Sequence, residues 1–167
     1  MKVQSSENAP LLPFLCAGIG ADSINQSVKA IIIARNYMVD EGLDCAISSA
    51  EVNSEVGPDA LTFSVSLHAK TLDVACPEDN TFKCAATTKA PMLAGAIANR
   101  IREGAKHLSV TSVGPMAALR NIKAYCIAKT YLEEAGYDFY LVPFFVQVSV
   151  GEEDRTGIRL DAFVSKK

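Results

Sequence analysis

Short apolar runs alternate along the chain with longer mixed segments that are expected to be helical. Segment 61–67 has the clearest strand pattern, because its serines at 64 and 66 alternate with large apolar residues, the period of a half-buried strand. The pattern predicts strands at 14–19, 43–49, 61–67, 81–86, 108–113, 139–150 and 156–164. It predicts helices at 23–39, 91–103 and 115–135. Charged or Pro/Gly-bearing turns at 56–60 and 151–155 predict two hairpins, 43–49 with 61–67 and 139–150 with 156–164.

The predicted helix starts carry residues that are typical of caps. Side-chain caps are expected from Asp22 or Ser23 for the first helix and from Thr87 or Thr88 for the second. Pro115 suits the first turn of the third helix, where a missing N–H costs no hydrogen bond. These positions predict where each helix begins.

An internal repeat relates the two halves of the chain. A shift of 94 residues brings the segment from Gly20 into register with the segment from Gly114, and 11 of 38 aligned positions are identical. Each copy is predicted to run strand, helix, strand, strand. The identical pairs are Gly20/Gly114, Lys29/Lys123, Ala30/Ala124, Ile33/Ile127, Ala34/Ala128, Tyr37/Tyr131, Gly42/Gly136, Asp44/Asp138, Val52/Val146, Val56/Val150 and Gly57/Gly151.

The second copy has a further strand and helix ahead of the repeated unit, which gives it the order β-α-β-α-β-β. We therefore predict a partial repeat at 14–68 (the first copy), a linker at 69–80 and a complete repeat at 81–165 (the second copy). The helical runs 31–34 and 125–128 are apolar in nearly every direction, so each helix needs cover on a second side. We expect the other copy, or another chain, to supply it, and we favour an α+β internal pseudo-dimer.

Composition adds limits on the class of protein. The 167 residues are 49% hydrophobic and 21% charged, which predicts a buried core and excludes a disordered chain. No apolar run approaches the length of a membrane span, and residues 1–13 lack the pattern of a signal peptide. Five cysteines without a C-x-x-C pair indicate reduced thiols and a cytoplasmic protein, and two isolated histidines favour no metal site.

Charge is distributed unevenly along the chain. The formal net charge is -3, but residues 1–75 hold 4 basic against 9 acidic residues. Residues 83–129 hold 8 basic residues against a single acid, Glu103. The acidic total therefore hides a basic segment in the first half of the second copy, which is compatible with an anionic partner.

The chain resembles the stage V sporulation protein S family, small bacterial proteins built like the Alba-type nucleic-acid-binding domains. The resemblance rests on the stretch Ile19-Gly-Ala-Asp-Ser-Ile-Asn-Gln-Ser-Val-Lys-Ala-Ile-Ile-Ile-Ala-Arg35 in the first copy. In the second copy it rests on Leu93-Ala-Gly-Ala-Ile97, Arg102-Glu103, Ile122-Lys-Ala124 and Gly151-Glu-Glu-Asp-Arg-Thr-Gly-Ile-Arg-Leu160.

The resemblance implies two SpoVS-like, Alba-like repeats, the first without its leading strand and helix, and a nucleic-acid-binding character without a catalytic motif. The family is single-copy, whereas this chain is tandem. The family's Asn-Gln pair is kept as Asn25-Gln26 but becomes Leu119-Arg120 in the second copy. A role that requires two identical Asn-Gln faces is therefore not expected.

Alba-type folds present the loop after the first strand to nucleic acid. Here that loop is Lys83-Cys-Ala-Ala-Thr-Thr-Lys89, where hydroxyls and helix-start N–H groups lie beside lysines. Basic residues also recur at equal places in the two copies. The candidate binding residues are Lys83, Thr87, Thr88, Lys89, Arg120, Lys123, Lys129, Lys29 and Arg35. The alternative for the loop is a capped helix with ordinary surface lysines.

Other features weigh against a conventional site. Three acids at the tip 151–155 repel phosphates, and Arg155 and Arg159 are able to pair with them. The segment from Gly18 to Ser23 resembles the start of a dinucleotide fingerprint but lacks its third glycine, which favours a plain strand-to-helix turn.

Two functions remain open from the sequence. The first is a non-catalytic protein that binds RNA or DNA, because no Ser/His/Asp or Cys/His arrangement stands out and no cofactor is implied. The second is an assembly protein that binds protein partners or self-associates through its apolar helices and the aromatic strand at 137–145.

Overall fold

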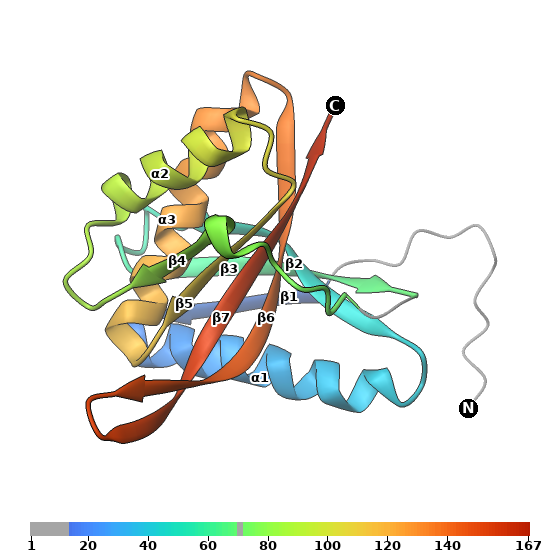
Figure 1. Ribbon diagram of the computed structural model, residues 1–167, viewed down its shortest axis with the longest axis vertical. Coiled ribbons are helices and arrows are strands. Elements are labelled where there is room, and N and C mark those ends of the chain that lie inside the picture. Colours follow the sequence, from blue (N-terminus) through green and yellow to red (C-terminus); the bar gives the residue numbers. More distant parts are fainter. Residues whose placement is uncertain (1–13, 70–71) are drawn as a thin grey trace.

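The computed structural model describes residues 14–69 and 72–167 as a mixed α+β protein (Figure 1). This part of the chain forms one seven-stranded sheet and three α-helices. The strands are β1 (Phe14–Ile19), β2 (Asp44–Val52), β3 (Ala60–His68), β4 (Thr81–Cys84), β5 (His107–Ser112), β6 (Tyr137–Val150) and β7 (Glu153–Lys166). The helices are α1 (Ala21–Val39), α2 (Ala90–Arg102) and α3 (Pro115–Glu133), with a short 3-10 helix at Glu78–Asn80.

The sheet has the order β1-β3-β2-β6-β7-β5-β4. Its neighbours are antiparallel except β4 and β5, which are parallel and joined through α2. Both predicted hairpins are confirmed as β2–β3 and β6–β7. The β6–β7 turn is tighter than expected, because Glu153, Asp154 and Arg155 continue the strand pairing and leave the turn at 151–152.

The two copies meet where β2 pairs with β6. The paired residues are Ile47 and Leu141, which occupy equivalent positions 94 residues apart. Outward from this pair, β3 and β1 follow β2 on one side, and their equivalents β7 and β5 follow β6 on the other. Only β4 has no counterpart among the strands described for the first copy.

The helices lie against each other across the same junction. Helix α3 contacts both α1 and α2 (Figure 1). One cluster of buried apolar side chains runs through both copies and includes Ile31 and Ile32 of α1 and Tyr125 and Ala128 of α3. Ile33 remains 46% exposed. The second side of α1 is covered by α3, as predicted, but Ile33 stays exposed because no described helix covers α1 as α2 covers α3.

The predicted side-chain caps are wrong. Helix α1 begins at Ala21 behind Gly20, whose φ of 84° makes the turn, and no side chain caps it. Helix α2 has Lys89 at its N-cap, also without a side-chain cap. Thr88 is used inside the loop, where its Oγ1 accepts a hydrogen bond from the N–H of Ala85 at 2.8 Å. Pro115 does occupy the first turn of α3, as predicted.

The opposite face of the sheet carries a smaller apolar cluster of Ala46, Leu72 and Val142. Leu72 belongs to the predicted linker, and its N–H donates to Asp44 Oδ2 at 2.9 Å. The linker is thus anchored to the first strand of the junction and carries the chain across the sheet toward β4. The helices of the described residues are all too short or too polar to span a lipid bilayer.

Candidate nucleic-acid interface

A groove of about 360 Å³ lies between the β4–α2 loop and the β6–β7 hairpin of the second copy. Lys83 and Thr88 line it from the loop side, and Arg155 lines it from the hairpin. Val113 and Val148 form part of its apolar surface. The fold therefore brings together polar and cationic groups that are about seventy residues apart in the sequence.

Arg120 of α3 holds the β4–α2 loop in place through a hydrogen bond. This half-buried residue of α3 donates from Nη1 to the carbonyl oxygen of Thr88 at 3.3 Å. Its Nε is buried and has no hydrogen-bond partner among the described residues. Lys83, Thr87 and Lys89 are exposed around the same loop. Arg120 therefore positions the loop, while the two lysines are free to meet solvent or a ligand.

The start of α2 strengthens the positive character of this region. Its first turn contains no acidic residue, and its N-cap makes no side-chain hydrogen bond. Helix N-termini present unsatisfied N–H groups and a partial positive charge. The loop therefore places lysines next to a group that favours anions.

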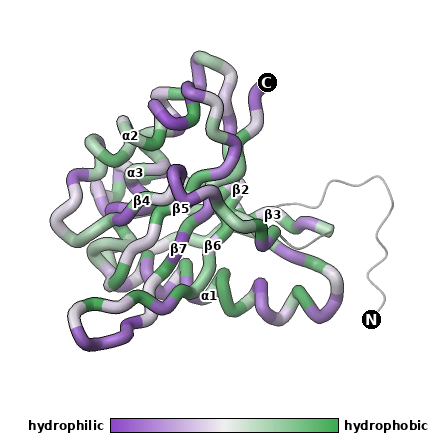
Figure 2. Tube along the Cα trace, viewed as in Figure 1, coloured by the Kyte–Doolittle hydropathy of each residue, from purple (hydrophilic) through white to green (hydrophobic). Residues whose placement is uncertain are grey.

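The tip of the β6–β7 hairpin is acidic and hydrophilic, as the purple loop in Figure 2 shows. Arg155 makes no ion pair among the described residues. Arg159 pairs with Asp161 at 2.9 Å and approaches Asp73 at 3.9 Å, so the idea that it pairs with the tip acids is wrong. The sequence did not indicate that Arg155 faces the groove, because strand direction and register decide it.

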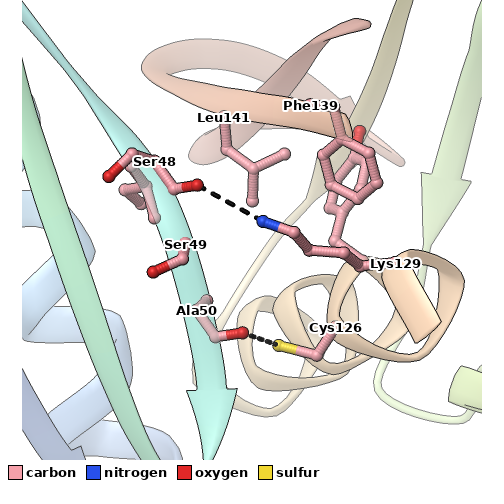
Figure 3. A pocket seen from close by; sticks show the side chains of 9 residues that line it. Ser48, Ser49, Ala50, Cys126, Lys129, Phe139 and Leu141 are labelled. Atoms are coloured by element: carbon pink, nitrogen blue, oxygen red, sulfur yellow. Dashed lines mark hydrogen bonds between the residues drawn. The ribbon is translucent and has the colours of Figure 1, made fainter. Parts of the chain in front are cut away.

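Two predicted site residues are engaged elsewhere in ion pairs. Lys123 pairs with Asp59 of the first copy at 3.2 Å, and Lys129 pairs with Asp138 at the same distance. Lys129 also donates to the carbonyl oxygen of Ser48 at 3.4 Å (Figure 3). Both lysines therefore connect α3 to neighbouring segments and lie outside the groove.

Figure 3 shows the narrow slot between β2 and α3 into which Lys129 points. Beside it, the Cys126 thiol donates to the carbonyl oxygen of Ala50 at 3.2 Å. Burial raises the pKa of Cys126 to about 11, so this thiol is protonated at neutral pH. The slot is a packed contact between the copies, with a volume of only about 10 Å³.

Arg35 lies inside the protein. Its Nε and Nη2 donate to the two carboxylate oxygens of Asp44 at 2.7 and 2.9 Å, and Nη1 donates to the carbonyl oxygen of Pro143 at 2.6 Å. Its guanidinium carbon also lies 4.3 Å from the centre of the Phe144 ring. With its donors used by internal partners, Arg35 is not available to an external anion.

Lys29 lies away from the groove, in a polar pocket at the start of α3 that it shares with Asn25. The first copy has its own groove at the place equivalent to that of the second. This groove, of about 400 Å³, is lined by uncharged residues that include Ala17, Ile19 and Val56. The structure thus gathers the predicted loop residues around one groove, in the second copy.

Cys76, His107 and Asp161 also come together. The imidazole Nε2 of His107 lies 3.0 Å from Asp161 Oδ2, but the Cys76 thiol donates to the backbone oxygen of His107 at 3.7 Å. Burial and then the charge of Asp161 raise the pKa of Cys76 to about 11. A nucleophilic cysteine needs the opposite shift and a base at its sulfur, so this cluster is built for packing.

No group of three or more His, Cys, Asp or Glu within residues 14–69 and 72–167 is placed to hold a metal ion. The fold and groove define a small α+β protein with a duplicated strand–helix–strand–strand unit. The family model described as stage V sporulation protein S matches residues 14–65 and 80–165. The chain therefore belongs to the stage V sporulation protein S family, which confirms the resemblance, and the match falls in two segments.

Proposed function

We propose that this protein is a non-catalytic nucleic-acid-binding protein whose second copy carries the binding surface. The observation that supports it is the convergence of Lys83, Thr88 and Arg155 on one groove. Lys89 and the start of α2 lie beside this groove and add to its attraction for phosphate. The equivalent groove of the first copy has no charged residue in its lining and does not take this role.

The acidic hairpin tip limits the kind of nucleic acid that fits. Glu152, Glu153 and Asp154 are exposed there and repel a second phosphate backbone. The groove itself offers cations at its edges and valines between them. We therefore propose that a single strand is favoured over a duplex, because a single strand lies in the groove without bringing phosphates against the tip.

We further infer that the chain is an internal pseudo-dimer of Alba-like units. The pairing of Ile47 with Leu141 and the packing of α1 on α3 place equivalent elements against each other. The free thiols at Cys16, Cys45 and Cys84 agree with a reducing compartment such as the cytoplasm.

Fluorescence anisotropy across a salt series tests the nucleic-acid proposal, with labelled single-stranded and duplex RNA and DNA. We expect affinity to fall steeply with salt. Lys83→Glu and Lys89→Glu should each weaken binding and reduce the salt slope by about 1. Lys106→Glu is the matched control, because Lys106 is exposed in the same basic segment but precedes β5 at its opposite end.

Two results would contradict the proposal. One is a flat titration with every nucleic acid at low salt. The other is an equal loss of affinity in Lys83→Glu and Lys106→Glu, because the net charge of the segment would then be responsible rather than the groove.

Assembly through protein contacts is a second candidate, which a specific observation favours. Among the described residues β1 pairs only with β3, so it is an edge strand, and Phe14, Leu15 and Ile19 on it are 60%, 73% and 67% exposed. An exposed apolar edge is a template for another strand. Light scattering should then show oligomers that Leu15→Lys dissociates, whereas a monomer at all concentrations would exclude self-association through β1.

A further inference from the structure

A second cavity, of about 300 Å³, lies where the two copies meet near the β6–β7 hairpin. The first three turns of α1 line it with Asp22, Asn25, Gln26 and Lys29. The start of α3 contributes Gly114 and Pro115, and the hairpin contributes Arg155. The lining is mostly polar, and the cavity is at the small end of the range for ligand sites.

Asn25 is the residue that most clearly points to a ligand. Its side chain lines the cavity, yet the residue is only 5% exposed. Its amide makes no hydrogen bond with the described residues. The amide is not fully buried, because it faces the cavity, so it is free to meet a hydrogen-bonding ligand or water there.

The charges around the cavity favour an anion. Lys29 and Arg155 form no ion pair within the described part of the chain, and Asp22 is the one carboxylate of the lining. Helix α3 has no acidic residue in its first turn, and no side chain caps its N-terminus. A helix of 19 residues that opens on the cavity in this way adds a positive partial charge, although Pro115 itself has no N–H to donate.

The equivalent positions in the second copy have lost this character. Leu119 replaces Asn25 and is buried. Lys123 replaces Lys29 and is neutralised by Asp59 at 3.2 Å. The amide and the free cation are therefore kept together on one side of the junction only.

We propose that this cavity binds a small phosphate monoester that carries hydroxyl groups, of the size of a sugar phosphate. Lys29, Arg155 and the start of α3 bind the phosphate. Asn25 donates to a ligand oxygen, and Asp22 accepts from a ligand hydroxyl, which a bare phosphate ion does not have.

This site adjoins the proposed nucleic-acid groove but also has lining residues of its own. The two share Ser112, Arg155 and the adjoining hairpin, but Asn25, Gln26 and Lys29 line only the cavity, and Lys83 lines only the groove. The inference therefore goes beyond the proposed function, and each is tested with variants that leave the other intact.

Isothermal titration of the full chain with ribose 5-phosphate tests the proposal, with ribose and inorganic phosphate as separate arms. We expect one site per chain, no binding of ribose and weaker binding of inorganic phosphate. Asn25→Leu, which installs the residue found at the equivalent position, should weaken ribose 5-phosphate binding by about ten-fold or more. Lys29→Gln should do the same, and Lys83→Glu should leave it unchanged.

Several outcomes would overturn the proposal. They are no heat with ribose 5-phosphate, equal affinity in Asn25→Leu, and binding that Lys83→Glu weakens as much as Lys29→Gln. Binding of single-stranded RNA that Lys29→Gln weakens, without any binding of ribose 5-phosphate, would assign the cavity to the nucleic-acid backbone instead. Thermal unfolding of each variant ensures that lost affinity is not lost folding, and Lys29→Gln, on a half-buried side chain, keeps the test valid if Asn25→Leu is unstable.

Discussion

Two acid–base pairs occupy equivalent positions in the two copies. Arg35 and Asp44 form one, and Lys129 and Asp138, each 94 residues later, form the other. In both pairs the carboxylate also accepts from the next backbone N–H, at 2.7 Å from Cys45 and 2.8 Å from Phe139. The first pair is buried and bidentate, whereas the second is partly exposed, so their energetic roles differ.

Removing one charge from each pair separates these roles. Asp44→Asn should cost about 3–5 kcal/mol in the free energy of unfolding, because it leaves the Arg35 charge buried without its counter-charge. Asp138→Asn is the matched control and should cost about 1 kcal/mol or less, because water screens this pair. Urea unfolding of both variants measures the difference, and equal losses would contradict it.

The same carboxylate should give the fold an acid-sensitive component. Burial raises the pKa of Asp44, but hydrogen bonds from Arg35 and from the N–H groups of Leu72 and Cys45 outweigh burial and lower it below 3.8. A depressed pKa contributes stability that is fully present above the unfolded value and is lost as the pH falls through the folded one. The free-energy difference between wild type and Asp44→Asn should therefore shrink below pH 3.8. A difference independent of pH in that range would contradict the assignment.

The repeat in the sequence relates the two acid–base pairs, but it does not indicate which pair is buried and which is exposed. Arg35 and Lys129 are both basic and occupy equivalent positions, which predicts the same anion contact for both. Whether a charge faces water depends on the packing of α1 against β2 and β6, which brings Asp44 and the Pro143 carbonyl to the guanidinium. Repeat alignment alone does not give that packing.

At the scale of elements, the β6–β7 hairpin forms one wall of both the groove and the cavity. Its course depends on Gly157, where a Cβ would lie 2.6 Å from the carbonyl oxygen of Ser112. No side chain fits there unless β7 moves away from β5. A small residue at this point therefore sets how closely the hairpin approaches the start of α3.

Gly157→Ala should destabilise the protein by about 1–3 kcal/mol through this overpacking. Gly95→Ala is the control, because nothing lies within 4 Å of its Cβ position in the middle of α2. It should stabilise the protein by about 0.4–1 kcal/mol by reducing the freedom of the unfolded chain. Thermal unfolding of the two variants should give shifts of opposite sign, and shifts of the same sign would contradict this account.

Element boundaries followed from the sequence where the apolar pattern is decisive. Strand β1 was predicted with its observed bounds, and both hairpins were found. The start of α3 at Pro115 agrees with the prediction, whereas α1 begins two residues earlier than predicted, because Gly20 makes the turn with a positive φ and replaces the expected side-chain cap. Strand β7 was predicted too short, because the charged residues 153–155 pair with β6 while facing solvent.

At the scale of the whole molecule, both copies share one sheet and one core. The pair Ile47–Leu141 lies in the middle of both, and each residue is buried. The apolar helices predicted a partner for each copy. The order of the strands was not predictable, because either edge of each unit was available for pairing and the choice depends on tertiary contacts.

A shared core predicts a single unfolding transition for the described part of the chain. Ile47→Ala should lower the stability by about 2–5 kcal/mol and move the whole transition to lower temperature. Calorimetry measures the shift of the transition. A spectroscopic probe placed in each copy shows whether the two copies unfold together. Loss of the first copy at a temperature where the second remains folded would show that the copies unfold independently.

Because the two copies are joined in one chain, their equivalent surfaces are able to carry different residues. In a symmetric homodimer every substitution occurs twice, so a pocket on one side is repeated on the other. Here Asn25 and Leu119 are encoded separately, and one is polar while the other is apolar, although both are buried. The joined molecule therefore has one cationic groove and one polar cavity, each present once. A heterodimer has the same asymmetry, but it forms only when two different chains associate.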